Sequence, residues 1–265
     1  MFVSLNHICS QMEYCSMQES FCHLRALLNY AYNNAGNESS IYGAVSFILT
    51  LFCTSARVTA TKSKDLYLGS FPQKDLKKYT QEKKYRAPDF TVLVVQSASG
   101  PISTEQKIKD IGPLIWEVKA SPGALTWFGK ERPTHVDLAE NFSKYFQQIV
   151  TQVTYAKAKF NQKLIYALLS VDIWFVLLYF PGDPPSIMWN RKNGTFRSQT
   201  ANYRKFSEYI LIPPAPIVNE ECTAFSPEFL YALELSVKNL TEVTVTPHPY
   251  FRAPEGTAEL VSAQV

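Results

Sequence analysis

Two stretches of the chain carry apolar residues in helical patterns. Residues 41–52 are almost wholly apolar and follow the small polar residues of 37–40, which is typical of a capped helix start. Residues 138–158 predict one long amphipathic helix, because their apolar side chains recur at helical spacing. The apolar stripe consists of Phe142, Tyr145, Phe146, Ile149, Val153 and Ala156.

Strand-like runs lie between and after these helices. Residues 57–61, followed by 64–68, are rich in β-branched and alternating residues and predict a first strand or hairpin. Residues 88–95 and 113–119 predict two buried strands, and residues 173–180 predict another that ends at a Pro-Gly turn. The order is helix, three strands, helix, strand. The sequence therefore predicts an α/β (α+β) fold.

The C-terminal part gives weaker patterns. Residues 186–198 predict a hairpin with a basic turn, and residues 203–212 predict a further strand. The proline-rich residues 213–216 are expected to break regular structure, and a capped helix is predicted at 226–237. The tail after Thr246 is rich in proline and is expected to be flexible.

These patterns divide the chain into three parts. We expect an N-terminal extension at 1–29, a main domain at 30–212, and a C-terminal helix with a flexible tail at 213–265. Hydrophobic residues make up 46% of the 265 positions, which is enough for a sizeable core.

Three ionisable residues lie in the predicted strands. Asp89 begins one strand, and Glu117 and Lys119 point to the same face of the next, because strand side chains alternate with period two. A buried charge is costly unless it is paired or holds a metal. The pattern therefore indicates a divalent-metal site. The alternative is an ordinary ion pair of Glu117 and Lys119 on an exposed strand face, worth ~1 kcal/mol at most.

Pro88-Asp89 followed by Glu117-Val118-Lys119, in this order of elements, resembles the PD-(D/E)xK superfamily of nucleases. The resemblance covers roughly residues 30–180 and implies a restriction-endonuclease-like αβββαβ core, a central mixed sheet flanked by helices, here with a C-terminal extension. It also implies a metal-dependent hydrolase of nucleic-acid phosphodiester bonds. Asp89 and Glu117 would bind Mg²⁺ or Mn²⁺, Lys119 would orient the attacking water, and these three are the expected catalytic residues.

The resemblance assigns further residues by role. The main-chain carbonyl of Val118 and the carboxylate of Glu38, at the start of the first helix, are the additional metal ligands that it implies. The alternative for Glu38 is a solvated residue that suits the helix dipole. Gln148 and Gln152 lie on the second helix, where the superfamily places polar residues toward the nucleic acid or the site. The alternative is that both glutamines lie on a solvated face.

Basic residues are concentrated just before Asp89. The net charge of +3 does not by itself indicate nucleic-acid binding, but residues 62–86 contain eight basic and three acidic residues. Such a run attracts phosphates, although a solvated loop is the alternative. The expected nucleic-acid-binding residues of this run are Lys77, Lys78, Lys83, Lys84 and Arg86. Lysines of the second helix either extend this basic run into a cationic groove or merely solvate the helix: Lys144, Lys157, Lys159 and Lys163.

Two other classes of function stay open. One is a non-catalytic module with a nuclease-like fold that binds nucleic acid or a protein partner. The other, an integral membrane protein, rests on the apolar run 164–180, which is shorter than the ~20 residues of a membrane span and contains Asp172. A helix end followed by a buried strand explains this run better, so no membrane partner is expected.

Cysteine usage and the N-terminus bear on the compartment. The five cysteines are odd in number and match no zinc-binding pattern, so reduced thiols are the default. The first residues lack the pattern of a signal peptide. We therefore expect an intracellular protein, cytoplasmic or nuclear. The resemblance implies that its partner is nucleic acid, in the first place DNA. The oligomeric state stays open.

Overall fold

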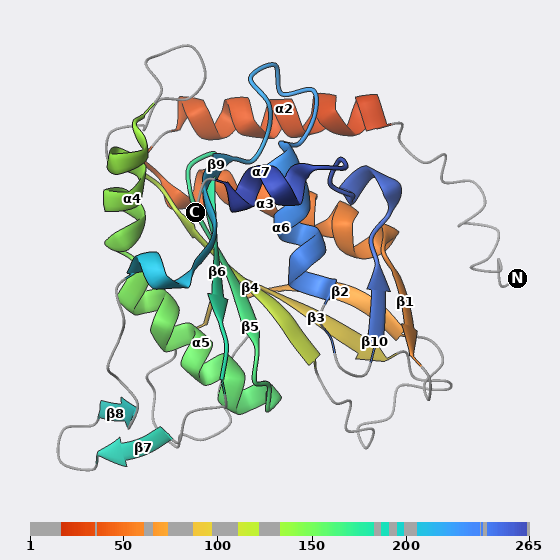
Figure 1. Ribbon diagram of the computed structural model, residues 1–265. Helices are drawn as coiled ribbons and strands as arrows, with labels where there is room; N and C mark the ends of the chain where they lie inside the picture. Colours follow the sequence, from red (N-terminus) through yellow and green to blue (C-terminus); the bar gives the residue numbers. More distant parts are fainter. Residues whose placement is uncertain are drawn as a thin grey trace, which may run out of the picture.

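A six-stranded mixed sheet forms the centre of the molecule (Figure 1). The computed structural model describes residues 17–34, 36–60, 66–73, 87–96, 111–121, 133–182, 187–190, 195–198, 206–238, 240 and 243–263. The strands of the central sheet are β2 (Leu66–Pro72), β3 (Phe90–Gln96), β4 (Ile111–Lys119), β5 (Ile165–Val171), β6 (Trp174–Phe180) and β9 (Ile210–Pro216). They are hydrogen-bonded in the order β2-β3-β4-β5-β6-β9. The pair β4–β5 is parallel, and the other neighbours are antiparallel.

Helices cover both faces of this sheet (Figure 1). One hydrophobic core lies between the sheet and the helices α3, α6, α2 and α7, and the other lies between the sheet and α4 and α5. Strand β4 serves both cores, because Trp116 and Val118 belong to the first and Ile115 to the second. The helices are α2 (Met17–Asn33), α3 (Glu38–Ser55), α4 (His135–Ser143), α5 (Phe146–Phe160), α6 (Pro227–Lys238) and α7 (Thr257–Ser262).

The α/β class predicted from the sequence is present, with a central mixed sheet flanked by helices. Helix α3 begins after Asn37, whose side-chain oxygen accepts the backbone N–H of Ser39 at 3.1 Å. Helix α6 begins after Ser226, whose hydroxyl accepts the N–H of Phe229 at 3.2 Å. The predicted hairpin is formed by β7 (Ile187–Asn190) and β8 (Thr195–Ser198).

The first predicted strand pairs differently from a hairpin. Strand β1 (Arg57–Ala60) pairs with β10 (Val243–Thr246) in a separate two-stranded sheet, whereas β2 forms an edge of the central sheet. Pairing between segments so distant in sequence is set by tertiary packing, and here Val243 and Val245 belong to the core under α3 and α6.

The second predicted helix is divided into two. Helix α4 ends at Ser143, and α5 begins after Tyr145. The N–H of Tyr145 donates to the carbonyl of Phe142 at 3.1 Å, a hydrogen bond of the 3₁₀ type that spans three residues. This tighter turn changes the direction of the chain between the two helices. Phe142 is fully buried before this break. Apolar spacing alone did not reveal the break.

The helix end expected before residue 173 is wrong, because residues 165–171 form strand β5. This strand is buried along its whole length, since its parallel neighbour β4 and its antiparallel neighbour β6 place it in the middle of the sheet. A fully buried strand lacks the alternation that identifies a half-buried one, so its sequence resembles a buried helix. The apolar run 164–180 is thus mostly a β-hairpin. None of the helices that the structure describes is long and apolar enough to cross a membrane.

The C-terminal part also departs from expectation. Residues 213–216, expected to break regular structure, complete β9, where the prolines are tolerated because β9 is an edge strand of the sheet. The tail after Thr246 was expected to be flexible, yet it forms a 3₁₀ turn, η2 (Pro249–Phe251), and helix α7. Phe251 packs edge-on against Phe52 with ring centroids 5.3 Å apart. The expected domain limits at 29/30 and 212/213 fall inside α2 and β9.

The turn between β5 and β6 holds a buried carboxyl group. Asp172 has a positive φ of 52°, and its N–H donates to the carbonyl of Lys119 at 2.9 Å. One carboxyl oxygen accepts the N–H of Ser121 at 3.3 Å, and the other has no partner among the described residues. The side chain is 5% exposed, and burial raises the pKa of Asp172 to about 6.

We predict that Asp172→Asn stabilises the protein at neutral and alkaline pH. The pKa of Asp172 in the folded protein, about 6, exceeds the ordinary value of 3.8. Ionised Asp172 therefore lowers the free energy of unfolding above pH 6, and this destabilisation disappears as the pH falls from 6 to 3.8. Asparagine tolerates positive φ and keeps an acceptor for Ser121. The free energy of urea unfolding should rise by on the order of 1–3 kcal/mol near pH 8 and change little near pH 4. An equal change in the free energy of unfolding at both pH values would contradict the raised pKa of Asp172.

Candidate functional site

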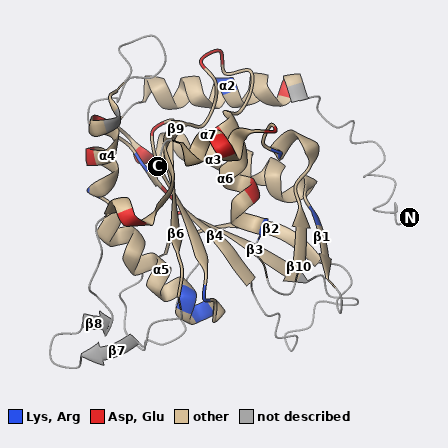
Figure 2. Cartoon of the chain, viewed as in Figure 1, with Lys and Arg blue, Asp and Glu red and all other residues tan. Residues whose placement is uncertain are grey.

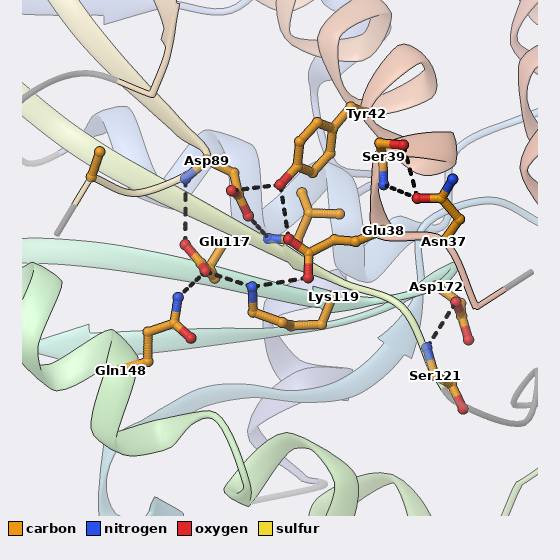
Figure 3. A network of polar contacts seen from close by, with 12 residues as sticks. Asn37, Glu38, Ser39, Tyr42, Asp89, Glu117, Lys119, Ser121, Gln148 and Asp172 are labelled. Carbon is orange, nitrogen blue, oxygen red and sulfur yellow. Dashed lines mark hydrogen bonds and ion pairs between the residues drawn. The ribbon is translucent and has the colours of Figure 1, made fainter. Parts of the chain in front are cut away.

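Asp89, which directly precedes β3, lies opposite Glu117 of the neighbouring strand β4. Phe90 pairs with Trp116 in the antiparallel register, so Asp89, one residue earlier, faces Glu117, one residue later. The backbone N–H of Asp89 donates to Glu117 Oε2 at 3.3 Å, and the N–H of Val118 donates to Asp89 Oδ2 at 2.7 Å. The structure thus brings together the two carboxylates that the sequence placed on successive strands (Figure 3).

The first two turns of α3 add a carboxylate and a phenol. The Tyr42 hydroxyl lies 2.8 Å from Glu38 Oε1 and 2.7 Å from Asp89 Oδ1. Glu38 and Tyr42 are four residues apart, so they lie on the same side of the helix. The Glu38 side chain is 39% exposed, yet it reaches the site (Figure 3). Its interpretation as a purely solvated residue is therefore wrong.

The ammonium group of Lys119 bridges two of the three carboxylates. It lies 2.8 Å from Glu117 Oε1 and 3.2 Å from Glu38 Oε2, and 5.9 Å from the ring centroid of Tyr145. The Glu117 side chain is 2% exposed and that of Lys119 is 11% exposed. The ion pair is therefore buried, unlike the exposed surface pair that was the alternative for these two residues.

Two glutamines of α5 hold the other side of Glu117. The side-chain amide of Gln148 donates to Glu117 Oε1, and that of Gln152 donates to Glu117 Oε2 at 2.7 Å and to the carbonyl of Ala87 at 3.3 Å. Gln152 is buried, and its own carbonyl oxygen has no partner among the described residues. The solvated-face alternative is wrong for both residues. The amides instead tie α5 to the carboxylate of β4.

The electrostatics of the cluster favour added positive charge. Three carboxylates and one ammonium give −2 when all are ionised: Glu38, Asp89, Glu117 and Lys119. Burial raises the pKa of Asp89, and burial followed by the charge of Asp89 raises the pKa of Glu117. Burial acts to lower the pKa of Lys119, but the hydrogen bond and charge of Glu117 outweigh it and the net shift is upward. Binding of a cation or a proton would relieve the excess.

Sequence reasoning missed the two tyrosines of the site. The pKa of Tyr42 is raised, first by burial and then by its hydrogen bond to Asp89, so the phenol stays protonated and donates. Tyr145 lies beside the Lys119 ammonium at the start of α5. The position of Tyr42, one helical turn after Glu38, was the signal available in the sequence. No comparable signal marked Tyr145, because it belonged to the apolar stripe.

The donor chemistry of the cluster fits a hard divalent cation. Carboxylate and carbonyl oxygens, here from Glu38, Asp89, Glu117 and Val118, are the ligands that Mg²⁺, Mn²⁺ and Ca²⁺ prefer. The described residues include no group of three or more His, Cys, Asp or Glu arranged to hold a metal. In this structure Lys119 lies between Glu117 and Glu38, so a cation between those carboxylates would require the ammonium group to move.

The expected basic patch lies outside the described residues. This applies to Lys77, Lys78, Lys83, Lys84 and Arg86. Among the lysines of the second helix, Lys157 is buried and donates to the carbonyls of Pro181 and Gly182 at 2.9 and 3.0 Å. Lys157 therefore connects the C-terminal end of α5, which Figure 2 shows to be basic, to the residues that follow β6. Lys144 is exposed and lies 3.9 Å from Glu140.

Comparison of the chain with protein-family models, with curated proteins and with solved structures gives no match. The resemblance to the nuclease superfamily consequently depends on the motif residues and on the order of the elements that carry them. Function is accordingly argued below from the site itself.

We predict that Lys119→Met lowers stability most at alkaline pH. The substitution removes the ammonium group that pairs with Glu117 and Glu38, and breaking a buried pair is destabilising. We expect the free energy of unfolding to fall by about 1–3 kcal/mol near pH 8. This is less than the ~3–5 kcal/mol lost when a fully buried ion pair is broken, because Glu38 retains contact with solvent. The loss should shrink near pH 5 as Asp89 and Glu117, whose pKa values are raised, take up protons.

Urea unfolding in the presence of a metal chelator measures this effect. Lys144→Met is the matched control, because Lys144 is exposed and its ion pair with Glu140 is a surface pair. An equal and small effect of both substitutions at both pH values would show that Lys119 does not compensate the buried carboxylates.

Proposed function

We propose that the protein is a metal-dependent nuclease that hydrolyses phosphodiester bonds of nucleic acid, DNA in the first place. The observation that carries this proposal is the convergence of Asp89, Glu117 and Lys119 with Glu38 at one end of the sheet, with an excess of negative charge. Buried carboxylates in excess over cations are typical of sites that bind a divalent ion.

The order and pairing of the elements support a PD-(D/E)xK-like fold. Along the chain α3, β2, β3, β4, α5 and β5 give helix, three strands, helix, strand, with β1 inserted between α3 and β2 and α4 preceding α5. Strands β2, β3 and β4 are antiparallel neighbours, and β5 returns parallel to β4 after the helical connection. Asp89 precedes β3, and Glu117, Val118 and Lys119 end β4, as the motif of the superfamily would require.

The roles of the residues follow from their positions. Asp89, Glu117, Glu38 and the carbonyl of Val118 would hold Mg²⁺ or Mn²⁺. When bound, such an ion stabilises negative charge on a phosphate and lowers the pKa of water. Lys119, once it leaves Glu117, would orient the attacking water and share the charge of the phosphate. The carboxylate of Glu117 is held in place by Gln148 and Gln152 and that of Asp89 by Tyr42.

A non-catalytic module is the second candidate, and one observation favours it. Lys119 is engaged by two carboxylates, and the described residues form no ready metal-binding set. In that case the cluster would serve to join α3, β4 and α5 while another surface binds nucleic acid or a protein partner. Metal-dependent cleavage distinguishes the two candidates.

Substitutions within the motif should separate metal binding from cleavage. In Lys119→Met the carboxylates are intact, so Mn²⁺ binding should survive while cleavage falls by orders of magnitude. In Glu117→Gln a charged ligand is lost, so both should weaken. Calorimetric titration with Mn²⁺ and nicking of supercoiled plasmid DNA measure the two properties. Lys238→Met, which removes an exposed charge from α6, is the control and should behave as the wild type.

The assays also decide between the candidates. Wild-type protein that binds no Mn²⁺ and cuts neither DNA nor RNA, while folded, would exclude the nuclease and leave the non-catalytic module. Mn²⁺ binding without cleavage would support a metal site that serves another reaction or a structural role, and would equally overturn the proposal.

Neutralising the basic run should weaken the salt dependence of nucleic-acid binding. Lys77, Lys78, Lys83 and Lys84 would be replaced together by glutamine. Each phosphate contact contributes ~0.9 to the slope of log affinity against log salt concentration for B-DNA, so the slope should fall by up to roughly three to four. Fluorescence anisotropy with labelled duplex DNA across a salt series gives this slope. An unchanged slope would show that the run does not contact phosphates and would favour the alternative, a solvated loop.

A further inference from the structure

A cavity of about 690 Å³ lies between α2, the turn that leads into α6, and η2. Helix α2 contributes Gln18, Phe21, Cys22 and Arg25, whose spacing places them on one face of the helix. The cavity is therefore distinct from the carboxylate cluster, which uses residues of α3, β4 and α5. Its volume falls within the range of about 300–1,000 Å³ in which proteins bind small organic ligands.

The walls of the cavity are mainly apolar and aromatic. Phe225 is buried and packs against Phe21 with ring centroids 5.0 Å apart, while Leu230 and Tyr250 complete the apolar lining. Tyr250 is 53% exposed, so the aromatic lining continues to the surface. An apolar surface that is open to water in this way is typical of a binding site for a ligand with an apolar body.

The turn on the far side of the cavity is held by hydrogen bonds. Asn219 Oδ1 accepts the backbone N–H groups of Thr223 and Ala224 at 2.8 and 3.1 Å, and Val218 forms a β-bridge with Phe225. These contacts hold the backbone around Cys222, which has a positive φ of 51°. The cavity wall is thus formed by local bonds before any ligand is bound.

One permanent charge faces the cavity. Arg25 is the only Lys, Arg, Asp or Glu among the described residues that line it. The charge of Arg25 acts within the cavity: burial raises the pKa of the Cys222 thiol, Arg25 opposes this shift, and Glu221 adds to it. A guanidinium beside an apolar cavity attracts a carboxylate, sulfonate or phosphate group.

We propose that this cavity binds a small organic anion with an aromatic or aliphatic body. The apolar part would lie against Phe225, Leu230 and Tyr250, and the anionic group would contact Arg25. A cationic ligand of the same shape would be repelled by Arg25, and a neutral ligand would lose the charged contact.

Fluorescence titration with anilinonaphthalenesulfonate, an aromatic sulfonate, tests the proposal on the full chain. The wild type should bind one molecule of the probe, and decanoate should displace it more effectively than decanol or decylamine. Arg25→Met should weaken binding about tenfold, as expected for loss of one charge-assisted contact, and Arg25→Lys should restore most of it. Lys238→Met, which removes an exposed charge from α6, is the control and should change nothing.

Two further measurements locate the bound probe. Cys22→Trp places a large side chain in the cavity from an exposed helix position and should abolish binding without unfolding the protein. The bound probe should also slow alkylation of Cys22 and Cys222, measured by mass spectrometry of their peptides. Absence of probe binding, equal binding by Arg25→Met and wild type, or unchanged alkylation of both cysteines would each overturn the proposal.

Discussion

The carboxylate of Glu117 is the group around which one end of the sheet is organised. An ionised carboxylate in this buried position would cost several kcal/mol if it had no partners. It receives hydrogen bonds from the amides of Gln148 and Gln152, the N–H of Asp89 and the ammonium of Lys119. These groups come from α5, from the entry to β3 and from β4 itself. Their common partner therefore fixes how the helix lies on the sheet.

The negative charge of Glu117 is balanced by more hydrogen-bond donors and positive charge than the charge of the cluster as a whole. Lys119 supplies one positive charge, whereas Glu38 and Asp89 bring two further carboxylates that share a single hydroxyl, that of Tyr42. A structural ion pair would need no third carboxylate, and replacement of such a group by an apolar side chain is often neutral or stabilising. In the nuclease that we propose, a bound cation would account for this surplus of acid.

The sequence was informative wherever side chains alternate or recur with a clear period. Period two placed Glu117 and Lys119 on one face, and the antiparallel register then placed Asp89 opposite Glu117. Strand β5 was missed because both of its faces are buried, so its sequence shows no alternation. The contacts of Gln152 and Tyr42 depend on how α5 and α3 pack on the sheet, and spacing along the chain does not specify this. The prolines of β9 were misinterpreted because their edge position is a property of the sheet order.

Helix α3 shows how tightly the fold and the site depend on one another. Its first turn is polar and carries Glu38. Its buried residues, from Ile41 to Cys53, pack against one face of the sheet. Tyr42 lies where these two parts meet: its ring packs edge-on against Phe90 with centroids 5.8 Å apart, and its hydroxyl reaches Asp89. Because Phe90 directly follows Asp89 in the chain, one side chain of α3 positions both the core residue and the acid. The apolar packing of α3 thereby positions the carboxylates of Glu38 and Asp89 relative to the sheet.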